Sequence, residues 1–300
     1  MLQKCLPKGF KIIFGLMFEK IVLSEKMRKI SQKFEDIVVG MLDVLDPPRR
    51  KRLLDNRMCF QSVVKSLETG INWRELPLLM KLTCSWSTVY KRFTKWVNDG
   101  VLSSIWEELV NRYYDAKSKD AYWFKDLFID STQVRNIQGR DVIGRNHMDR
   151  NRMGTKASVI CDRSGIPLSC QMYPSNLHDS QTTENAINGL TFDISRIDGR
   201  RRTYLIGDKG YISEGTRQRL AARNIKLLTP YRRNQRLRNN PVSLINKERL
   251  KKRIVIEHVF NRLDSKRRLI LRYEHTCKHF LAFHHLAFIL WMDGAIVSNY

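Results

Sequence analysis

The sequence has no pair of cysteines in CxxC spacing, although six cysteines are scattered along its 300 residues. The missing spacing excludes a zinc ribbon and a thioredoxin-type redox motif. A disulfide framework is not expected either, because such frameworks hold together much smaller chains. We therefore predict reduced thiols, as in a cytoplasmic protein, at Cys5, Cys59, Cys84, Cys161, Cys170 and Cys277.

Long apolar runs, internal repeats and low-complexity tracts are also missing. The longest apolar run near the C-terminus, Leu286–Met292, is far shorter than the roughly 18 residues of a membrane span. The basic and apolar N-terminus has no small-residue cleavage site, and Lys11 and Glu19 interrupt it. We predict no membrane partner, and we interpret residues 1–44 as an N-terminal extension.

Acidic residues are scarce relative to basic ones: 54 Lys and Arg face 30 Asp and Glu, a net charge of +24. Residues 195–272 alone contain 23 basic and six acidic residues. Such a surface attracts polyanions, and nucleic acid is the expected partner. The alternatives are a solvated basic helix face and, more weakly, an acidic membrane surface, which one amphipathic basic helix would suit better.

Residues 45–118 have a helical pattern with tight turns, which we interpret as a small all-helical domain. Gly70 ends one helix, and a second begins at Ser85 and ends at Asn98–Gly100. Short helices with such turns are typical of a helix-turn-helix module, and a plain helical domain is the alternative. If the module binds DNA, its second helix would contribute Lys91, Arg92 and Lys95.

Residues 119–300 change to mixed strands and helices. Short apolar runs predict strands at 124–130 and 203–208, a hairpin around the turn at 162–165, and a last strand ended by Pro230. A long basic helix is expected over 246–271. The order of strand, hairpin, helix, strand, helix, strand and helix predicts one α/β domain with a mixed sheet and flanking helices.

Two of the predicted strands end in a carboxylate. Asp130 follows Leu127–Ile129, and Asp208 follows Leu205–Gly207. If the strands are neighbours, the two carboxylates lie side by side and require a cation, and hard oxygen ligands favour Mg²⁺ or Mn²⁺. Two such ions support phosphodiester chemistry. A turn or capping residue is the alternative for either aspartate alone.

Glu257 is a third candidate, on the long basic helix. Helical spacing places it between a polar stripe that includes Arg253 and an apolar stripe that includes Ile256 and Val259. A metal ligand at this border could reach a site at the strand ends. The alternative is an i, i+4 ion pair with Arg253, and the spacing alone does not choose between them.

Four segments in this order resemble a DDE transposase of the IS5 group of insertion sequences: LFIDSTQVR, SNLHDSQTT, YLIGDKGYIS and RIVIEHVFNRLDSKRRLILRYE. The upstream segments CFQSVVKSLETGINWRELP and SWSTVYKRFTKWVNDG resemble the helical N-terminal part of the same proteins, and the whole match covers about residues 45–295.

The resemblance implies an RNase H-like catalytic domain at 119–300 with a triad of Asp130, Asp208 and Glu257, which binds Mg²⁺, or Mn²⁺ in its place. It implies binding of the element's terminal inverted repeats, metal-dependent strand cleavage and transfer of the freed end to target DNA. The partners would be double-stranded DNA of element ends and target, with a homo-oligomer assembled on it in the cytoplasm at the nucleoid. Candidate DNA-binding residues are Lys91, Arg92, Lys95, Lys209, Arg253, Arg262, Lys266, Arg267 and Arg268.

The sequence departs from the family's helix signature at two positions. Leu250 occupies the position of a Tyr, and Asp264 that of a Lys, with Lys266 two residues further on. A decayed or co-opted copy that binds DNA without cutting it is therefore the alternative function. A nuclease that does not transpose is disfavoured by the helical N-terminal region.

Histidines and an aspartate outside the triad have plainer interpretations. His178 and Asp179 are expected to cap a short helix, with an accessory role in the site as the alternative. Four histidines near the C-terminus lie in an apolar helical pattern, so we expect them in packing rather than in a metal site: His275, His279, His284 and His285.

Overall fold

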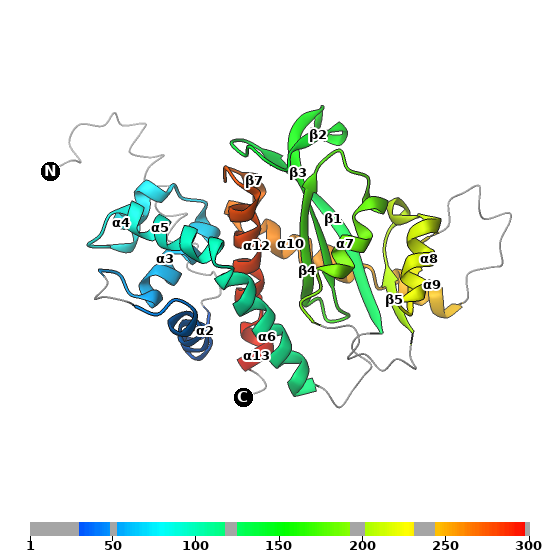
Figure 1. Cartoon of the computed structure of the whole chain (residues 1–300), viewed down its shortest axis with the longest axis horizontal. Helices are drawn as coiled ribbons and strands as arrows, with labels where there is room; N and C mark the ends of the chain where they lie inside the picture. The colour runs from blue at the N-terminus through cyan, green and yellow to red at the C-terminus, as the bar shows by residue number, and fades with distance from the viewer. Residues whose placement is uncertain (1–29, 49–52, 118–124, 193–201, 231–243, 298–300) are drawn as a thin grey trace, which may run out of the picture.

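The computed structural model of the chain describes residues 30–48, 53–117, 125–192, 202–230 and 244–297. Helices from the first part of the chain lie on one side of Figure 1, and a mixed sheet with its own helices lies on the other. Helix α12, Cys277–Trp291, runs between the two.

The first part consists of helices with well-defined ends. Ser31 and Asp55 cap the first two through their side chains, and Gly70 ends the second with a left-handed φ of 66°. The predicted helix after Ser85 and the turn before Gly100 are confirmed. The elements are α2 Gln32–Leu45, α3 Asn56–Thr69, η3 Trp73–Glu75, α4 Leu76–Met80, α5 Trp86–Asn98 and α6 Val101–Lys117.

These helices do not form a core of their own. Helix α12 packs against α6, α5 and α3, and the short α13, Asp293–Val297, packs against α2 and α6. One continuous apolar cluster joins Phe34 of α2 and Trp106 of α6 to Phe283 of α12 and to the sheet. Helix α2, most of which lies in the predicted extension 1–44, packs in this body. The predicted boundary near 118 falls at the edge of a range outside the described residues.

The sheet has the predicted RNase H-like order. Strand β1 is central: it pairs antiparallel with β3 and parallel with β5, β4 extends the sheet beyond β3, and β6 extends it beyond β5. The short β2 and β7 add to β3 and β1 at one end. The strands are β1 Asp126–Asn136, β2 Gly144–Asn146, β3 Arg152–Cys161, β4 Pro167–Pro174, β5 Thr203–Ile206, β6 Ile225–Leu228 and β7 Leu271–Arg272.

The single long helix predicted over 246–271 is instead divided into three. The helices around the sheet are η5 Asp179–Gln181, α7 Thr183–Asn188, η7 Lys209–Tyr211, α8 Glu214–Ala222, α9 Leu244–Lys251, α10 Ile254–Asp264 and α11 Arg267–Ile270. Breaks at Lys252–Arg253 and Ser265–Lys266 let α10 lie across β1 and β3 while α11 turns toward α3. Ile256, Val259 and Leu263 are the buried face of α10, as the predicted apolar stripe requires.

The C-terminal helices correct one expectation. Residues Cys277–Val297 have a mean hydropathy of 1.6 over a window long enough to cross a membrane, which the longest uninterrupted apolar run did not indicate. More than half of that window is buried inside the protein, as in a core helix of the fold. His284 within it is 1% exposed and its Nδ1 donates to the Phe280 carbonyl, so the predicted packing role is confirmed there.

The cysteine prediction holds for the described residues. Five of the six cysteines are free thiols, and all five are buried. Cys5 lies outside the described residues.

Candidate active site

Asp130 and Asp208 lie at the same level of two neighbouring parallel strands. The last paired residues of β1 and β5 are Phe128 and Ile206, and each aspartate comes two residues later. β1 continues past this point while β5 ends, so both carboxylates lie where the sheet opens, and Asp208 acts electrostatically on Asp130. The prediction that the two strands are neighbours is confirmed, but the predicted end of the first strand at Asp130 is wrong, because β1 continues alongside β3 to Asn136.

A tight turn after β5 fixes Asp208. Its Oδ1 accepts a hydrogen bond of 2.6 Å from the Gly210 backbone N–H at the start of η7. Gly207 allows the close approach of this turn to β1, because a Cβ there would lie 2.9 Å from the Tyr211 ring and 3.1 Å from Ile129. The GDKGY sequence therefore presents the Asp208 carboxylate to the end of β5.

Arg253 separates Glu257 from the aspartates. Its Nη2 lies 3.9 Å from Asp130 Oδ2 and 3.7 Å from Glu257 Oε1. The Glu257 side chain is 55% exposed in the first turn of α10, whereas that of Asp130 is 22% exposed. The i, i+4 ion pair of Glu257 with Arg253 is therefore present, and the role of Glu257 as a metal ligand stays a prediction.

The electrostatics of the site concentrate on Asp130. Burial raises the pKa of its carboxyl group, opposed by the hydrogen bond from the Ser131 N–H and by the positive charge of Arg253. The negative charges of Asp208 and Asp179 raise this pKa further, so all three carboxylates act on one another. A bound cation would reduce the repulsion between these negatively charged carboxylates.

Asp179 is the residue whose role the sequence left open. Its Oδ1 accepts hydrogen bonds of 2.8 Å from the Ser131 hydroxyl and of 2.8 Å from the ammonium of Lys156, which is 4% exposed. Its Oδ2 faces the turn of Asp208, 3.2 Å from where a Cβ of Gly210 would lie. The capping residue of η5 is His178, whose Nδ1 accepts from the Ser180 N–H, so the expected cap is present at His178 only.

The donor set suits a hard divalent cation at the aspartates. Carboxylate oxygens are the preferred ligands of Mg²⁺ and Mn²⁺, and Asp130 and Asp208 present them from adjacent strands. Among the described residues, however, no group of three His, Cys, Asp or Glu side chains has the spacing of metal ligands. Glu257 would join such a set only by exchanging its partner Arg253 for the cation.

Family models decide the relationship of the chain to known proteins. A model described as "Transposase DDE domain" matches residues 125–292, more than half of the chain. The chain belongs to this family. A second model, "Putative transposase of IS4/5 family", matches residues 37–106 of the helical part. The DDE transposase resemblance is thereby confirmed at the level of the IS4/5 family.

Individual proteins give weaker matches. The "Putative transposase for insertion sequence element IS6501" of Brucella ovis is 28% identical over 141 residues, 47% of this chain and 99% of that protein. The catalytic domain of Mos1 mariner transposase matches 65% of this chain and 93% of its own at 10% identity and a TM-score of 0.27. The Mos1 strand transfer complex matches 85% and 80% at 11% identity and a TM-score of 0.26.

Two predicted DNA-binding arginines have structural roles instead. Arg92 donates to Asn56 Oδ1 at 2.6 Å and to the Leu54 carbonyl at 3.0 Å, with a side chain only 11% exposed. Arg268 is 7% exposed and donates to Glu274 and to the Ile71 carbonyl. Both guanidinium groups are thus engaged by partners inside the fold, and a DNA-binding role for these two residues stays a prediction.

The other predicted basic residues differ in availability. Lys95 is half exposed and pairs with Asp46 and Asp99, and four further residues are exposed: Lys91, Lys209, Arg262 and Arg267.

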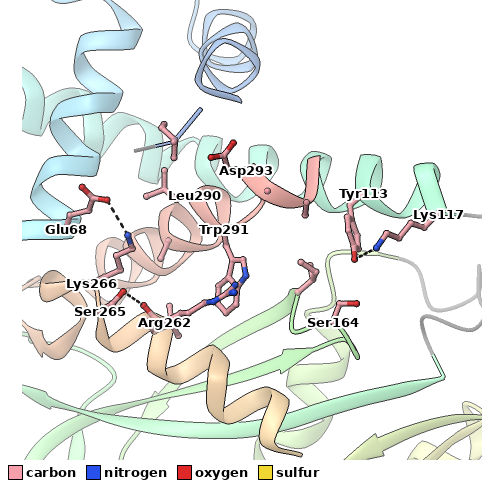
Figure 2. Close-up of a pocket in the computed structure, with 16 residues that line it drawn as sticks. Glu68, Tyr113, Lys117, Ser164, Arg262, Ser265, Lys266, Leu290, Trp291 and Asp293 are labelled. Atoms are coloured by element: carbon pink, nitrogen blue, oxygen red, sulfur yellow. Dashed lines mark hydrogen bonds and ion pairs between the residues drawn. The ribbon is translucent and has the colours of Figure 1, made fainter. Parts of the chain in front are cut away.

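Arg262 and Lys266 face a cavity of about 530 Å³ between α6, α10 and the C-terminal helices. Figure 2 shows Arg262 against the ring of Trp291, at 4.4 Å from its centroid, and Lys266 paired with Glu68. These contacts tie α10 and α11 to the helical part of the chain.

Proposed function

We propose that this member of the DDE transposase family cleaves DNA strands at the ends of its insertion sequence and joins them to target DNA. The observation that carries the proposal is the pair Asp130 and Asp208 at one level of β1 and β5, where the sheet opens. The partner is double-stranded DNA, which the net charge of +24 attracts. Assembly of two element ends calls for a homo-oligomer on DNA.

Asp130 and Asp208 are proposed to hold Mg²⁺ or Mn²⁺, with Glu257 as the third ligand. When bound, the divalent ions supply an activated attacking oxygen and compensate the charge on the leaving oxygen. The chain itself fixes the ligands: the Gly210 N–H orients Asp208, and the Ser131 N–H orients Asp130. Arg253 balances the charges of Asp130 and Glu257, and with a cation bound there its guanidinium would be available to a phosphate.

The exposed basic residues are proposed to hold the DNA backbone. Lys209 follows Asp208 directly, and Lys91 and Arg267 lie on the helical part and on α11. Phosphate contacts of this kind position a duplex without selecting its sequence.

A second candidate function is DNA binding without cleavage. Two observations favour it: Asp264 is a carboxylate where the family signature has a lysine, and Glu257 is bound to Arg253 rather than grouped with the aspartates. In that case the chain occupies element ends but leaves them intact.

A cleavage assay separates the two. The full chain is incubated with a duplex carrying the terminal sequence of its own element, in Mg²⁺ or in EDTA, and nicked and joined products are measured beside DNA affinity. We expect Mg²⁺-dependent products from the wild type, and their loss with retained affinity in Asp130→Asn, Asp208→Asn and Glu257→Gln. Glu214→Gln, an exposed carboxylate on α8, is the matched control and should keep full activity.

Binding without any product in Mg²⁺ or Mn²⁺ would select the second function. Full activity of one triad variant would remove that residue from the ligand set.

A further inference from the structure

A hairpin at one end of the sheet projects away from the helical part of the chain. It is formed by β2, the short η4, His147–Asp149, and the start of β3, and it stands at the top of Figure 1. The triad does not involve it. Its base, its turn and its exposed side chains each bear on what it does.

The base of the hairpin is held by a buried arginine. Arg272 is 0% exposed, and its Nη1 donates at 2.7 Å both to the Asp141 carbonyl and to Thr155 Oγ1. Its Nη2 pairs with the Asp141 carboxylate, and its Nε donates to the Glu274 carbonyl. Next to this network Val142 has a φ of 51°, an uncommon conformation for a β-branched residue. The surroundings therefore hold the entry to the hairpin in one conformation.

The turn of the hairpin is equally well defined. Asn146 Oδ1 accepts from the Met148 N–H at 3.0 Å, and His147 Nδ1 is hydrogen-bonded to Asn151 Oδ1 at 2.8 Å. Arg150 and Asn151 are consecutive left-handed residues, with φ of 51° and 59°. Gly144 packs so closely on Asn176 that a Cβ would lie 2.0 Å from its Oδ1. The hairpin is thus a preformed arm.

The exposed side chains of this arm include three arginines, beside the polar His147 and Asn151 and the apolar Met148 and Met153. Arg145, Arg150 and Arg152 are exposed, and Arg152 has a single weak partner, Asp149, at 3.7 Å. Between them Met148 is 91% exposed, the largest exposure of a large apolar side chain in the described part of the chain. Arginines around an unbranched apolar side chain fit a DNA groove, where arginines hold phosphates and a methionine packs against sugars and base edges.

We propose that this arm binds duplex DNA away from the cleaved bond, with its arginines on phosphates and Met148 in the groove. The inference rests on the proposed function for the identity of the DNA. The site and the arm are joined by β1, in which Asp130 lies six residues before Asn136 at the base of the arm. Six residues of strand span about 20 Å, which is roughly six base pairs along B-DNA.

The experiment compares arm variants of the full chain with matched surface controls. The probes are two duplexes with the terminal sequence of its own element, one ending four base pairs from the cleaved bond and one extending fifteen. Arg145→Ala with Arg152→Ala removes two charges, and Met148→Gln removes the apolar tip. Arg112→Ala on α6 and Leu78→Gln on α4, which is 87% exposed, are the controls.

On the long duplex, we expect Arg145→Ala with Arg152→Ala to bind about tenfold more weakly. The slope of log affinity against log salt concentration should become smaller in magnitude by between about one and two, because phosphate contacts are lost. Met148→Gln should keep the slope but lose hydroxyl-radical protection further from the cleaved bond than the roughly six base pairs that correspond to the base of the arm. Both variants should match the wild type on the short duplex.

The arm proposal is overturned if the arm variants bind the long duplex as tightly as the control variants do. In that case, cleavage by the wild type would still support the proposed function. A wild type that neither binds nor cleaves either duplex overturns both. Equal losses of affinity on the short and long duplexes would show that the arm binds DNA close to the cleaved bond. That result would also overturn the proposal, which places the arm away from this bond.

Discussion

The guanidinium of Arg253 lies 3.9 Å from the carboxylate of Asp130, across the gap between α10 and β1. The same nitrogen is 3.7 Å from Glu257, so one cation compensates two of the three proposed metal ligands. An arginine in this place bridges the two carboxylates in the free protein. It also competes with any divalent ion for them.

The first prediction follows from this competition. Arg253→Gln should bind Mn²⁺ more tightly than the wild type, on the order of threefold, because a partly exposed ion pair is worth at most about 1 kcal/mol. Isothermal titration of the DNA-free chain measures this. Arg253→Lys should stay close to the wild type, and Asp130→Asn with Asp208→Asn should abolish binding. Equal or weaker Mn²⁺ binding in Arg253→Gln would show that the arginine does not stand in for the ion.

The second prediction concerns the buried pair Lys156 and Asp179. Asp179→Asn leaves the 4% exposed ammonium without its charge partner and should lower the free energy of unfolding by about 3 kcal/mol. Lys156→Met with Asp179→Asn removes both charges and should recover part of that loss. Urea unfolding of the single and double variants measures the coupling. A double variant less stable than Asp179→Asn alone would argue against a paired charge.

The neighbouring positions of Asp130 and Asp208 could be predicted from the sequence, because both residues lie directly after short apolar runs and a parallel sheet aligns such runs. The sequence also predicted the strand order, the hairpin at 162–165 and the buried face of α10, all of which depend on local pattern. Helical spacing placed Glu257 beside Arg253 on α10. Spacing alone could not decide whether Glu257 forms an ion pair with Arg253 or serves as a metal ligand.

What the sequence did not predict depends on contacts between distant segments. Arg92 has the spacing of an exposed helix residue, yet Asp46, Asn56 and Leu54 approach it from other helices. The breaks on either side of α10 have neither Pro nor Gly to signal them, and they follow from packing on β1 and α3. Lys156 lies in an ordinary strand, and only the fold brings Asp179 to it.

The third prediction separates structure from DNA binding on α5. Arg92→Ala should lower the free energy of unfolding by about 2–3 kcal/mol, because Asn56 Oδ1 and the Leu54 carbonyl lose their hydrogen bonds from Arg92 and the 1% exposed Asp46 loses one of its positive neighbours. Lys91→Ala, on the exposed face of the same helix, should leave stability unchanged and weaken DNA binding equally for all sequences. Chemical unfolding and gel shifts of both variants test this. A stable Arg92→Ala with altered sequence preference would restore the base-contacting role.

The fourth prediction is a pH dependence from His284. Burial lowers the pKa of this histidine from 6.5 to about 4 in the folded chain. The unfolded chain therefore binds a proton first, and stability falls as pH decreases from 6.5 toward 4, by up to about 3 kcal/mol from this group. His284→Leu should lose that part of the pH dependence, while Phe288→Leu on the same helix should keep it. Urea midpoints at pH 7.5 and pH 5 measure the difference. An unchanged pH dependence in His284→Leu would contradict the assignment.

The fifth prediction concerns the shared core of the helical part and the catalytic domain. Trp106 of α6 packs on Phe288 of α12 with ring centroids 5.1 Å apart, and Phe93 of α5 packs on Phe283 at 4.8 Å. Both aromatic residues of α12 are 0% exposed, so a chain that ends at residue 117 uncovers the apolar faces of α5 and α6. We expect this fragment to be unfolded or aggregated, and residues 125–297 likewise, but the two expressed together to associate and show the cooperative unfolding of the full chain. Circular dichroism and gel filtration of the separate and combined fragments check this. A fragment 30–117 that unfolds cooperatively on its own would contradict the shared core. The helical part would then be an independent module, whose exposed Lys91 would act on DNA without support from α12.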